Sequence, residues 1–280
     1  MLREIHLLME NNRVLSKLVP LIYTPPVREM RSVYLMNQQK KEFQSFYQIN
    51  RERFHILEEM LEDDLSRDTL RTVIRYRTCP SYGMLKKVAV GHQYFLDELF
   101  KPFDEEVFID GGAYIGETIK NLSQWAGENS WKKVYCWEPD ELNRRKLIEN
   151  CKAYKNIEFI PYGLWSENTE LRFETGGGRG SQITKTGKDT IQVNCIDNVC
   201  KNEKVTYIKM DVEGSELQAL YGAKKVICRD KPRLGICIYH KPEDLLEIPM
   251  LIKEMVPEYK LYIRHHSPHW NETVVYAQIG

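Results

Sequence analysis

The sequence lacks an excess of charge of either sign, and it lacks a long hydrophobic run. Its 280 residues include 40 basic and 40 acidic side chains, so the formal net charge is zero. Without a global basic field, we expect neither nucleic acid nor an anionic membrane surface as a partner. No window approaches the roughly eighteen apolar residues of a membrane-spanning helix. Glu4 and Glu10 interrupt the apolar run that a signal peptide would need.

Cysteine pairs with the spacing of metal or redox sites are also absent. The seven cysteines are odd in number and dispersed, and none forms a C-x-x-C pair. This pattern indicates buried free thiols in a reducing compartment, so we expect a cytoplasmic protein. A hydrophobic content of 42% is enough for a substantial core.

Residues 1–100 carry helical periodicity and little strand character. Apolar side chains recur there at spacings of three and four, which predicts one buried face of a long helix. The polar Asn50 interrupts this stripe once, and Ser66 or Asp68 is expected to cap the next helix. The stripe consists of Phe43, Phe46, Tyr47, Phe54, Leu57, Leu61 and Leu65.

From about residue 104, short apolar runs alternate with helical segments, which is typical of a parallel sheet covered on both faces. The last two strands are too close in sequence for a crossover helix, so they should pair antiparallel or lie side by side through a simple turn. The predicted fold class is α/β: a doubly wound, Rossmann-like sheet of seven strands, the last antiparallel, preceded by a helical N-terminal region. The glycine-rich stretch 176–180 is expected to be a loop. The expected strands are 107–110, 133–137, 157–161, 206–210, 233–239, 259–263 and 273–278, and the expected helices are 115–126, 140–153, 215–226 and 243–255.

A glycine turn follows the first of these strands and contains Asp110, Gly111, Gly112, Tyr114 and Gly116. Glycines allow a sharp turn and a close approach of the backbone to a ligand. A dinucleotide would place its pyrophosphate here, but the carboxylate of Asp110 would repel phosphate. The same carboxylate would attract the amino group and sulfonium of S-adenosylmethionine. A tight structural turn, or a degenerate dinucleotide motif, is the alternative.

Glu138 and Pro139 follow the second strand. Glu138 lies about twenty residues beyond the glycines, the spacing at which a carboxylate accepts hydrogen bonds from both ribose hydroxyls. Pro139 fits the first turn of the next helix. Alternatively, Glu138 only complements the helix dipole. The segment 161–165, after the third strand, is a candidate wall for an adenine ring.

Acidic residues and a histidine follow the fourth and fifth strands. Asp211, Glu213 and Glu216 crowd one strand-to-helix turn, where the helix dipole alone could favour Glu216. His240, at the tip of the fifth strand, is a candidate general base, although a lone histidine is often structural. These residues should share the carboxyl edge of the sheet, where open α/β sheets bind ligands.

A basic cluster of Arg264, His265 and His266 follows the sixth strand and is expected to bind an anionic or sugar substrate. With Asp211 and His240 nearby it could also resemble a metal site. The spacing does not establish four ligands, so no metal is predicted, although a divalent ion remains compatible with the site.

Together these segments resemble the FkbM-type family of S-adenosylmethionine-dependent methyltransferases. The resemblance covers roughly residues 91–278 and leaves the N-terminal helices outside. It implies the class I methyltransferase form of the Rossmann-like sheet. The matching segments are GHQYF, VFIDGGAYIGET, VYCWEPD, TYIKMDVEGSELQAL, YHKPEDLLEIP and YKLYIRHHS.

The resemblance also implies the reaction: transfer of a methyl group to a hydroxyl oxygen, commonly on a sugar or a sugar-bearing natural product. The acceptor would be a small molecule or a glycan. By position, the methionine moiety would be held by Asp110, Gly111, Gly112 and Gly116, the ribose by Glu138, and the acceptor would face Asp211, Glu213 and His240.

We therefore expect O-methylation by in-line displacement, with His240 as the first candidate base and Asp211 as the second. Residues 101–280 would form the methyltransferase domain, and residues 1–100 a lid or a homodimer interface. One alternative is a nicotinamide-dependent oxidoreductase or epimerase, which Asp110 disfavours. Another is a non-catalytic binding protein of the same fold. Nucleic-acid methylation is disfavoured because no basic stripe and no N-P-P-Y motif is present.

Overall fold

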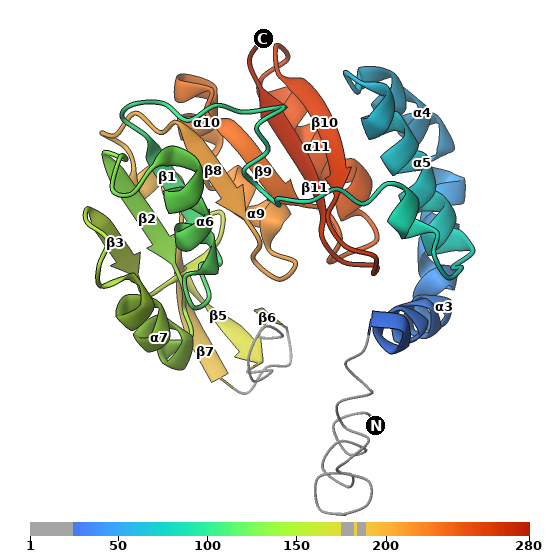
Figure 1. Ribbon diagram of the computed structural model, residues 1–280, viewed down its shortest axis with the longest axis horizontal. Coiled ribbons are helices and arrows are strands. Elements are labelled where there is room, and N and C mark those ends of the chain that lie inside the picture. The colour runs from blue at the N-terminus through green and yellow to red at the C-terminus, as the bar shows by residue number, and fades with distance from the viewer. Residues whose placement is uncertain (1–24, 175–181, 184–188) are drawn as a thin grey trace, which may run out of the picture.

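The computed structural model describes residues 25–174, 182–183 and 189–280. These ranges form a sheet with helices on both faces and three further helices along one edge (Figure 1). The predicted loop at 176–180, with Arg179, lies outside the described residues. No helix in the described ranges is both long and apolar enough to cross a membrane.

The main sheet has seven strands in the order β10-β11-β9-β8-β1-β2-β3. All seven predicted strands are present, with ends that differ by no more than about two residues, as expected for boundaries read from sequence. β11 pairs antiparallel with both β10 and β9, which confirms the predicted reversal, and the other neighbours are parallel. The strands are β1 (Val107–Gly111), β2 (Lys133–Trp137), β3 (Ile157–Ile160), β8 (Tyr207–Met210), β9 (Arg233–Cys237), β10 (Lys260–His265) and β11 (Thr273–Gln278).

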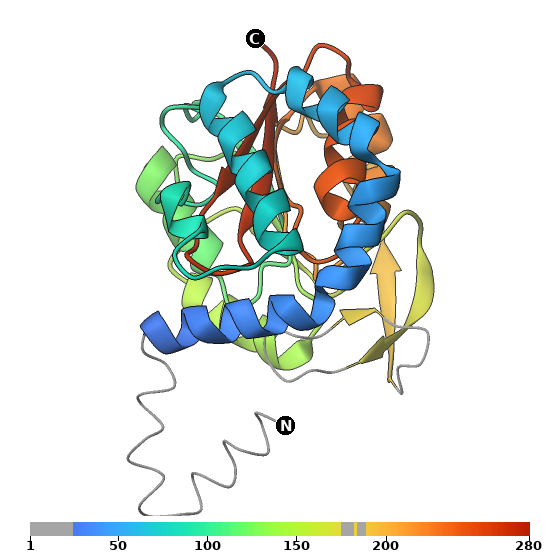
Figure 2. The same ribbon diagram turned by 90° about the vertical axis from the view of Figure 1, so that its right-hand side faces the viewer.

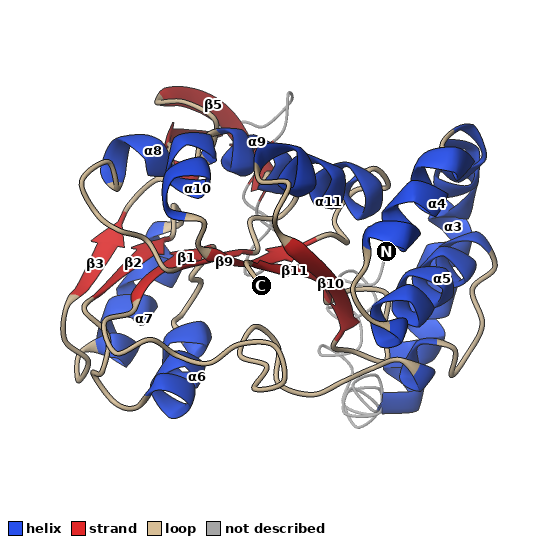
Figure 3. Ribbon diagram, turned by 90° about the horizontal axis from the view of Figure 1, so that it is seen from above, coloured by secondary structure: helices blue, strands red, loops and turns tan. Residues whose placement is uncertain are grey.

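Helices cover the two faces of this sheet in separate groups (Figure 3). The predicted helix at 215–226 is two helices, which are separated by Gly222 and Ala223. A Cβ atom at Gly222 would lie 2.1 Å from the Trp165 carbonyl oxygen. One face carries α6 (Glu117–Ala126) and α7 (Glu141–Cys151), and the other carries α8 (Ile196–Val199), α9 (Glu216–Tyr221), α10 (Lys224–Asp230) and α11 (Asp244–Met255).

The N-terminal helices lie beside β10, as the edge view shows (Figure 2). They are α3 (Pro25–Ile49), α4 (Arg51–Met60) and α5 (Asp64–Thr78), followed by the 3-10 turn η2 (Leu85–Lys87). Phe54, Leu57, Leu61 and Leu70 are buried in the same core as the sheet residue Leu261. The helices and the sheet are therefore stabilised by one continuous apolar core.

The predicted long helix is broken at Asn50, which leaves helical geometry with φ −106° and ψ 20° and donates its side-chain amide to the Phe46 carbonyl. Leu65, predicted to be on the buried stripe, is 37% exposed on the following helix. The cap of α5 is Asp63 rather than Ser66 or Asp68. Its carboxylate accepts from the Ser66 amide at 2.7 Å, which satisfies one of the free N–H groups of the first turn.

A small second sheet follows β3 and was not predicted. Its strands lie in the order β4-β7-β5-β6, and β5 and β7 do alternate polar with apolar residues, with two large apolar side chains in each. It lies near the carboxyl ends of the main strands (Figure 1). The four strands are β4 (Gly163–Leu164), β5 (Thr169–Glu174), β6 (Gln182–Ile183) and β7 (Asp189–Asn194).

Candidate active site

A cavity of about 390 Å³ opens at the carboxyl edge of the parallel strands. This volume is within the usual range of small-molecule sites, and its position is where open α/β sheets bind ligands. Segments from distant parts of the chain form its wall. They are residues 93–94, 112–114, 117–118, 137–139, 162–164, 211–213, 239–240 and 270–272.

The glycine turn after β1 brings Gly112 and Tyr114 to this cavity, while Gly111 and Gly116 lie outside the wall. Gly112 has φ +76°, and a Cβ atom there would lie 2.0 Å from the Asp211 carbonyl oxygen. Gly116, with φ +92°, is the N-terminal cap residue of α6. Gly112 is thus required by the close approach of the β1 turn to the end of β8, and Gly116 by its positive φ and by Cys151 of α7, whose Sγ would lie 2.7 Å from a Cβ atom there.

Asp110 does not reach the cavity, which corrects the expectation that it contacts the cofactor. Its side chain is completely buried and lies 2.9 Å from Nζ of Lys209. The Lys209 ammonium also donates to the carbonyls of Gly111 and Gly112. Burial alone would lower the pKa of Lys209, but the carboxylates of Asp110 and Asp211 raise it. Asp110 therefore positions Lys209, whose hydrogen bonds to Gly111 and Gly112 stabilise the glycine turn.

Glu138 lies between two turns at the end of the cavity that the glycine turn forms, with Pro139 beside it on the wall. Its Oε2 accepts from the Tyr114 amide at 3.0 Å, and its Oε1 accepts from the Asp140 amide at 2.9 Å. Burial raises its pKa to about 7, while the two backbone donors act in the opposite direction. Glu138 thus joins the first and second strand-to-helix turns and presents a carboxyl group to the cavity.

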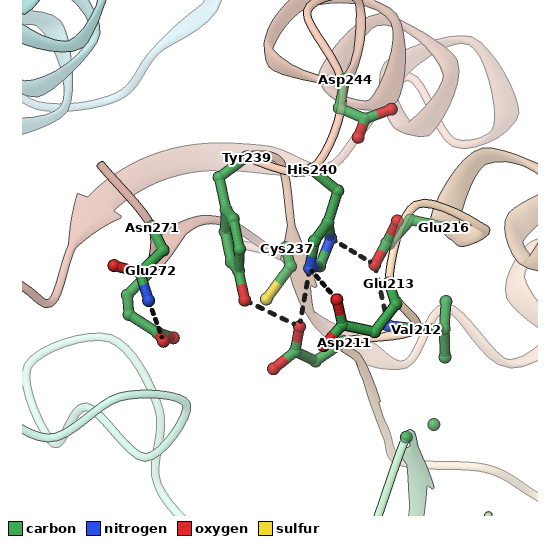
Figure 4. A network of polar contacts seen from close by, with 12 residues as sticks. Asp211, Val212, Glu213, Glu216, Cys237, Tyr239, His240, Asp244, Asn271 and Glu272 are labelled. Atoms are coloured by element: carbon green, nitrogen blue, oxygen red, sulfur yellow. Dashed lines mark hydrogen bonds and ion pairs between the residues drawn. The ribbon is translucent and has the colours of Figure 1, made fainter. Parts of the chain in front are cut away.

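His240 lies at the centre of three carboxylates at the other end of the cavity (Figure 4). Its Nδ1 is 2.9 Å from Glu216, and its Nε2 is 3.5 Å from Asp211 and 3.6 Å from Glu213. Burial would lower the pKa of His240, but the carboxylates, first of all Glu216, outweigh it and raise the pKa to about 10. The imidazole is therefore protonated at neutral pH.

The carboxylates of Asp211 and Glu213 differ in their surroundings. Asp211 accepts from the hydroxyls of Tyr239 at 3.0 Å and Tyr94 at 3.3 Å. Burial would raise its pKa, but the charges of Lys209 and His240 lower it. The side chain of Glu213 is 38% exposed, and burial raises its pKa to about 7.

The backbone of Glu213 has φ +54°, a conformation that non-glycine residues rarely adopt. Such conformations concentrate at functional sites, where the surrounding structure enforces them. The tight turn Val212–Gly214, with Gly214 also at positive φ, aims the Glu213 carboxylate at the cavity beside His240.

Asp211, Glu216 and His240 also offer ligand atoms within 4.8 Å of one another, a spacing that a metal ion could use. A histidine binds metal only when it is neutral. Binding of a metal would displace the proton of His240, whereas without a metal the protonated imidazole supplies the positive charge among these carboxylates.

Arg264 and His265 are buried and His266 is half-buried, and all three lie away from the cavity wall, so the expectation that they bind substrate is corrected. β10 extends to His265, and Arg264 therefore lies in the strand, where it pairs with Asp63 at 2.6 Å. His265 contacts Thr273 at 2.9 Å through Nδ1. Nε2 of His266 lies 2.8 Å from the Tyr276 hydroxyl, and burial lowers the pKa of both histidines to about 4.

Other residues of the cavity wall were not predicted as site residues. Glu272 accepts from Gln93 at 2.7 Å and from Asn271 at 2.9 Å. Tyr94 and Glu272 both have positive φ. Gln93 and Tyr94 lie in GHQYF, one of the segments that resemble the FkbM family, so the sequence did point to them. No local sequence pattern marks the turn 270–272, which the β10–β11 hairpin brings to the cavity.

The chain matches the family model described as the methyltransferase FkbM domain over residues 110–262, more than half of its length. It therefore belongs to the FkbM methyltransferase family, as the sequence segments predicted. No curated protein matches the chain.

Among solved structures, the chain is similar to the FkbM methyltransferase of Methylobacillus flagellatus KT, with a TM-score of 0.74 and 29% identity. That match covers 83% of this chain and 60% of the other, so this chain spans less than two thirds of that protein. An rRNA methylase from Streptococcus thermophilus matches with a TM-score of 0.42 and 16% identity, over 66% of this chain and 92% of the other. Aeropyrum pernix fibrillarin with natively bound S-adenosyl-L-methionine matches with a TM-score of 0.38 and 12% identity, over 62% and 66%. The family match and the solved structure of the same family agree with the seven-stranded sheet described above.

Proposed function

We propose that this protein is an S-adenosylmethionine-dependent O-methyltransferase that acts on a hydroxyl of a sugar or of a sugar-containing metabolite or glycan. The observation that carries the proposal is a single cavity with two chemically different ends. The glycine turn and Glu138 form one end, and the carboxylates around His240 form the other.

The cofactor end provides groups for each part of S-adenosylmethionine. The Glu138 carboxylate would accept from the ribose hydroxyls, and the segment 162–164 would flank the adenine ring. Asp110 is buried against Lys209, so we assign the contact with the methionine ammonium group to Glu117, which lies on the cavity wall at the start of α6. The cofactor supplies an electrophilic methyl group on a positively charged sulfur.

At the acceptor end, we assign proton removal to Glu213 rather than to His240. A general base must be unprotonated, and His240, with its raised pKa, is a cation at neutral pH. Glu213 has a pKa of about 7, which is near the optimum for a base at physiological pH. As the acceptor oxygen bonds to the methyl carbon and the carbon–sulfur bond breaks, the hydroxyl proton passes to the Glu213 carboxylate. His240 then balances the carboxylate charges and orients them.

The lining of the acceptor end fits a polyhydroxylated, uncharged acceptor. The rings of Tyr239 and Trp270 provide apolar faces, and the carboxylates of Glu213 and Glu272 can accept from hydroxyl groups. Among the described residues of the wall, the cations Lys209 and His240 both lie against carboxylates. A phosphorylated or carboxylated acceptor would therefore meet net repulsion.

Calorimetric titration with S-adenosylmethionine and S-adenosylhomocysteine tests the cofactor, with Glu138→Ala as the variant and Glu141→Ala as its control. Glu141 begins α7 and pairs with Arg145 on the surface. Loss of the ribose contact should weaken binding roughly 10- to 100-fold, because hydrogen bonds to charged groups contribute about 1.5–3 kcal/mol. The control should bind like wild type.

Acceptors are then screened by transfer of labelled methyl from the cofactor to neutral glycosides, uronates and sugar phosphates. Methylation of a neutral glycoside hydroxyl supports the proposal. Failure of the folded wild type to bind the cofactor would contradict it, and binding of reduced nicotinamide instead would favour an oxidoreductase. Cofactor binding without turnover on any acceptor class would favour a non-catalytic role.

A further inference from the structure

A buried arginine connects the N-terminal helices to the turn that carries His240. Arg77, in the last turn of α5, is only 4% exposed. Its Nη2 donates to the carbonyls of Tyr239 at 3.1 Å and Ile238 at 3.4 Å, and its Nη1 donates to that of Lys241 at 3.3 Å. The guanidinium group thus binds the main chain on both sides of His240.

Burial of a charged guanidinium group costs free energy, so we expect Arg77 to have a role that offsets this cost. A buried cation is normally paired with a carboxylate, but the hydrogen bonds of Arg77 go to backbone carbonyls. Burial lowers its pKa to about 10, while Asp244 acts to raise it, so the group stays charged at neutral pH. Charged donors make the stronger hydrogen bonds. Such bonds suit the segment 239–241, which lies beyond the last backbone hydrogen bond that joins the end of β9 to β11, from the Ile238 amide to the Thr273 carbonyl at 2.9 Å.

A second contact connects the same helices to the other loop of the acceptor end. The Trp270 amide donates to Oγ of Ser32, on α3, at 2.9 Å. Ser32 lies 2.8 Å from the hydroxyl of Tyr76, and both residues are buried. Tyr76 and Arg77 are consecutive in α5, so one helical turn holds both the hairpin loop at 270 and the turn at 240.

We propose that Arg77 is a positioning residue for the methyl-transfer site, and that the N-terminal helices α3 and α5 form the frame of its acceptor end. Arg77 fixes the main chain at 238–241, and through it the place of His240 between Glu216 and Asp211. Ser32 does the same for the loop that carries Trp270. This inference rests on the proposed function for its kinetic consequence, but its structural consequence can be measured without any acceptor.

The test compares Arg77→Met with Arg75→Met, because Arg75 is an exposed arginine two residues earlier on the same helix. The imidazole signals of His240 are followed by NMR during a pH titration of each folded protein. If Arg77 positions His240, the turn relaxes away from the carboxylates and the pKa of His240 falls by about one pH unit or more. If only the charge of Arg77 mattered, removal of a nearby cation would raise this pKa instead. A pKa equal to that of Arg75→Met, or a higher one, overturns the inference.

The kinetic arm uses an acceptor that wild type methylates. Arg77→Met should lower kcat roughly 10- to 100-fold, because small misplacement of reacting groups has effects of this size. Cofactor affinity should stay within about twofold, since Arg77 does not reach the cofactor end of the cavity. Parallel losses of kcat, cofactor affinity and thermal stability would show a general structural role instead.

If Arg77→Met does not fold, Arg77→Lys and Ser32→Ala replace it. The lysine keeps the charge but not the forked donors of the guanidinium group, so kcat and the pKa of His240 should fall part of the way from their wild-type values, and values equal to wild type would overturn the assignment of Arg77. Ser32→Ala should raise the KM for the acceptor and leave cofactor affinity unchanged, and no change in that KM would exclude Ser32 from the frame. Absence of cofactor binding by wild type would contradict the proposed function. The His240 titration needs no cofactor or acceptor, so it tests only the positioning role of Arg77.

Discussion

The two ends of the cavity are built in different ways. At the cofactor end, the glycine turn and Glu138 come from two units of strand, turn and helix, β1–α6 and β2–α7, each close in sequence. At the acceptor end, Tyr94, Glu213, His240 and Glu272 come from four separate parts of the chain, and α3 and α5 support them from behind. The cofactor end is thus built from short segments that are local in sequence. The acceptor end forms only when distant parts of the chain come together in the tertiary fold.

The two ends also use buried charge differently. Asp110 and Lys209 form a closed pair under the glycine turn, with both side chains almost fully buried. Glu213 and its neighbours surround His240 but remain open to the cavity. The buried Asp110–Lys209 pair should therefore affect mainly the free energy of unfolding, and the carboxylates around His240 should affect mainly kcat. The predictions that follow test this division.

The largest expected effect is on turnover. Glu213→Gln removes the proposed base and should lower kcat by roughly 10²- to 10⁴-fold, the usual contribution of general-base catalysis. The cofactor dissociation constant should not change, because Glu213 belongs to the acceptor end. Steady-state kinetics and calorimetry measure the two quantities. A loss of cofactor affinity as large as the loss of kcat would abolish the division between the two ends.

A second prediction concerns the stability of the closed pair. Asp110→Ala leaves the Lys209 ammonium buried without its partner, so the free energy of unfolding should fall by about 3–5 kcal/mol. Urea denaturation measures this loss. The double change Asp110→Leu with Lys209→Met should restore much of it, because an apolar pair needs no charge compensation. If Asp110→Ala kept full stability but lost the cofactor, Asp110 would contact the ligand after all.

The smallest expected effect is a graded dependence on pH at each end. A carboxyl group with a pKa of about 7 lies at both ends, Glu138 for the cofactor and Glu213 for the proton. Both groups act as carboxylates, so each function is complete above its pKa and is lost as the pH falls below it, by about tenfold per pH unit. Cofactor affinity should follow Glu138, and kcat at saturating cofactor should follow Glu213. A kcat profile that stays unchanged in Glu213→Gln would exclude Glu213 as its source.

The sequence predicted the sheet and the cofactor end more fully than the acceptor end. Strands and the glycine turn depend on local apolar patterning and backbone freedom, so β1, its turn and Glu138 could be located from sequence. The burial of Asp110 could not, because its partner Lys209 is about a hundred residues away in the chain and meets it only when β1 and β8 pair. Arg264 and His265 were assigned to a turn because the end of β10 was placed two residues early.

The proposed assignment of proton removal to Glu213 rather than to His240 could also not be predicted from the sequence. His240 has the ordinary pKa of a base when it is considered alone. Its raised pKa arises from three carboxylates that lie around it in the folded chain, and Glu216 among them is fully buried. The positive φ of Glu213 likewise has no signature in its side chain.

The reversed direction of β11 makes the hairpin between β10 and β11 a replaceable part of the molecule. Six residue pairs, from Lys260–Gln278 to His265–Thr273, fix the register of these strands, and the loop that carries Trp270 lies beyond the last of them. Residues can be inserted or exchanged in that loop without moving a strand, a crossover helix or the cofactor turns. If the proposed function holds, exchange of this loop would change the acceptor end of the cavity while the cofactor turns keep their place.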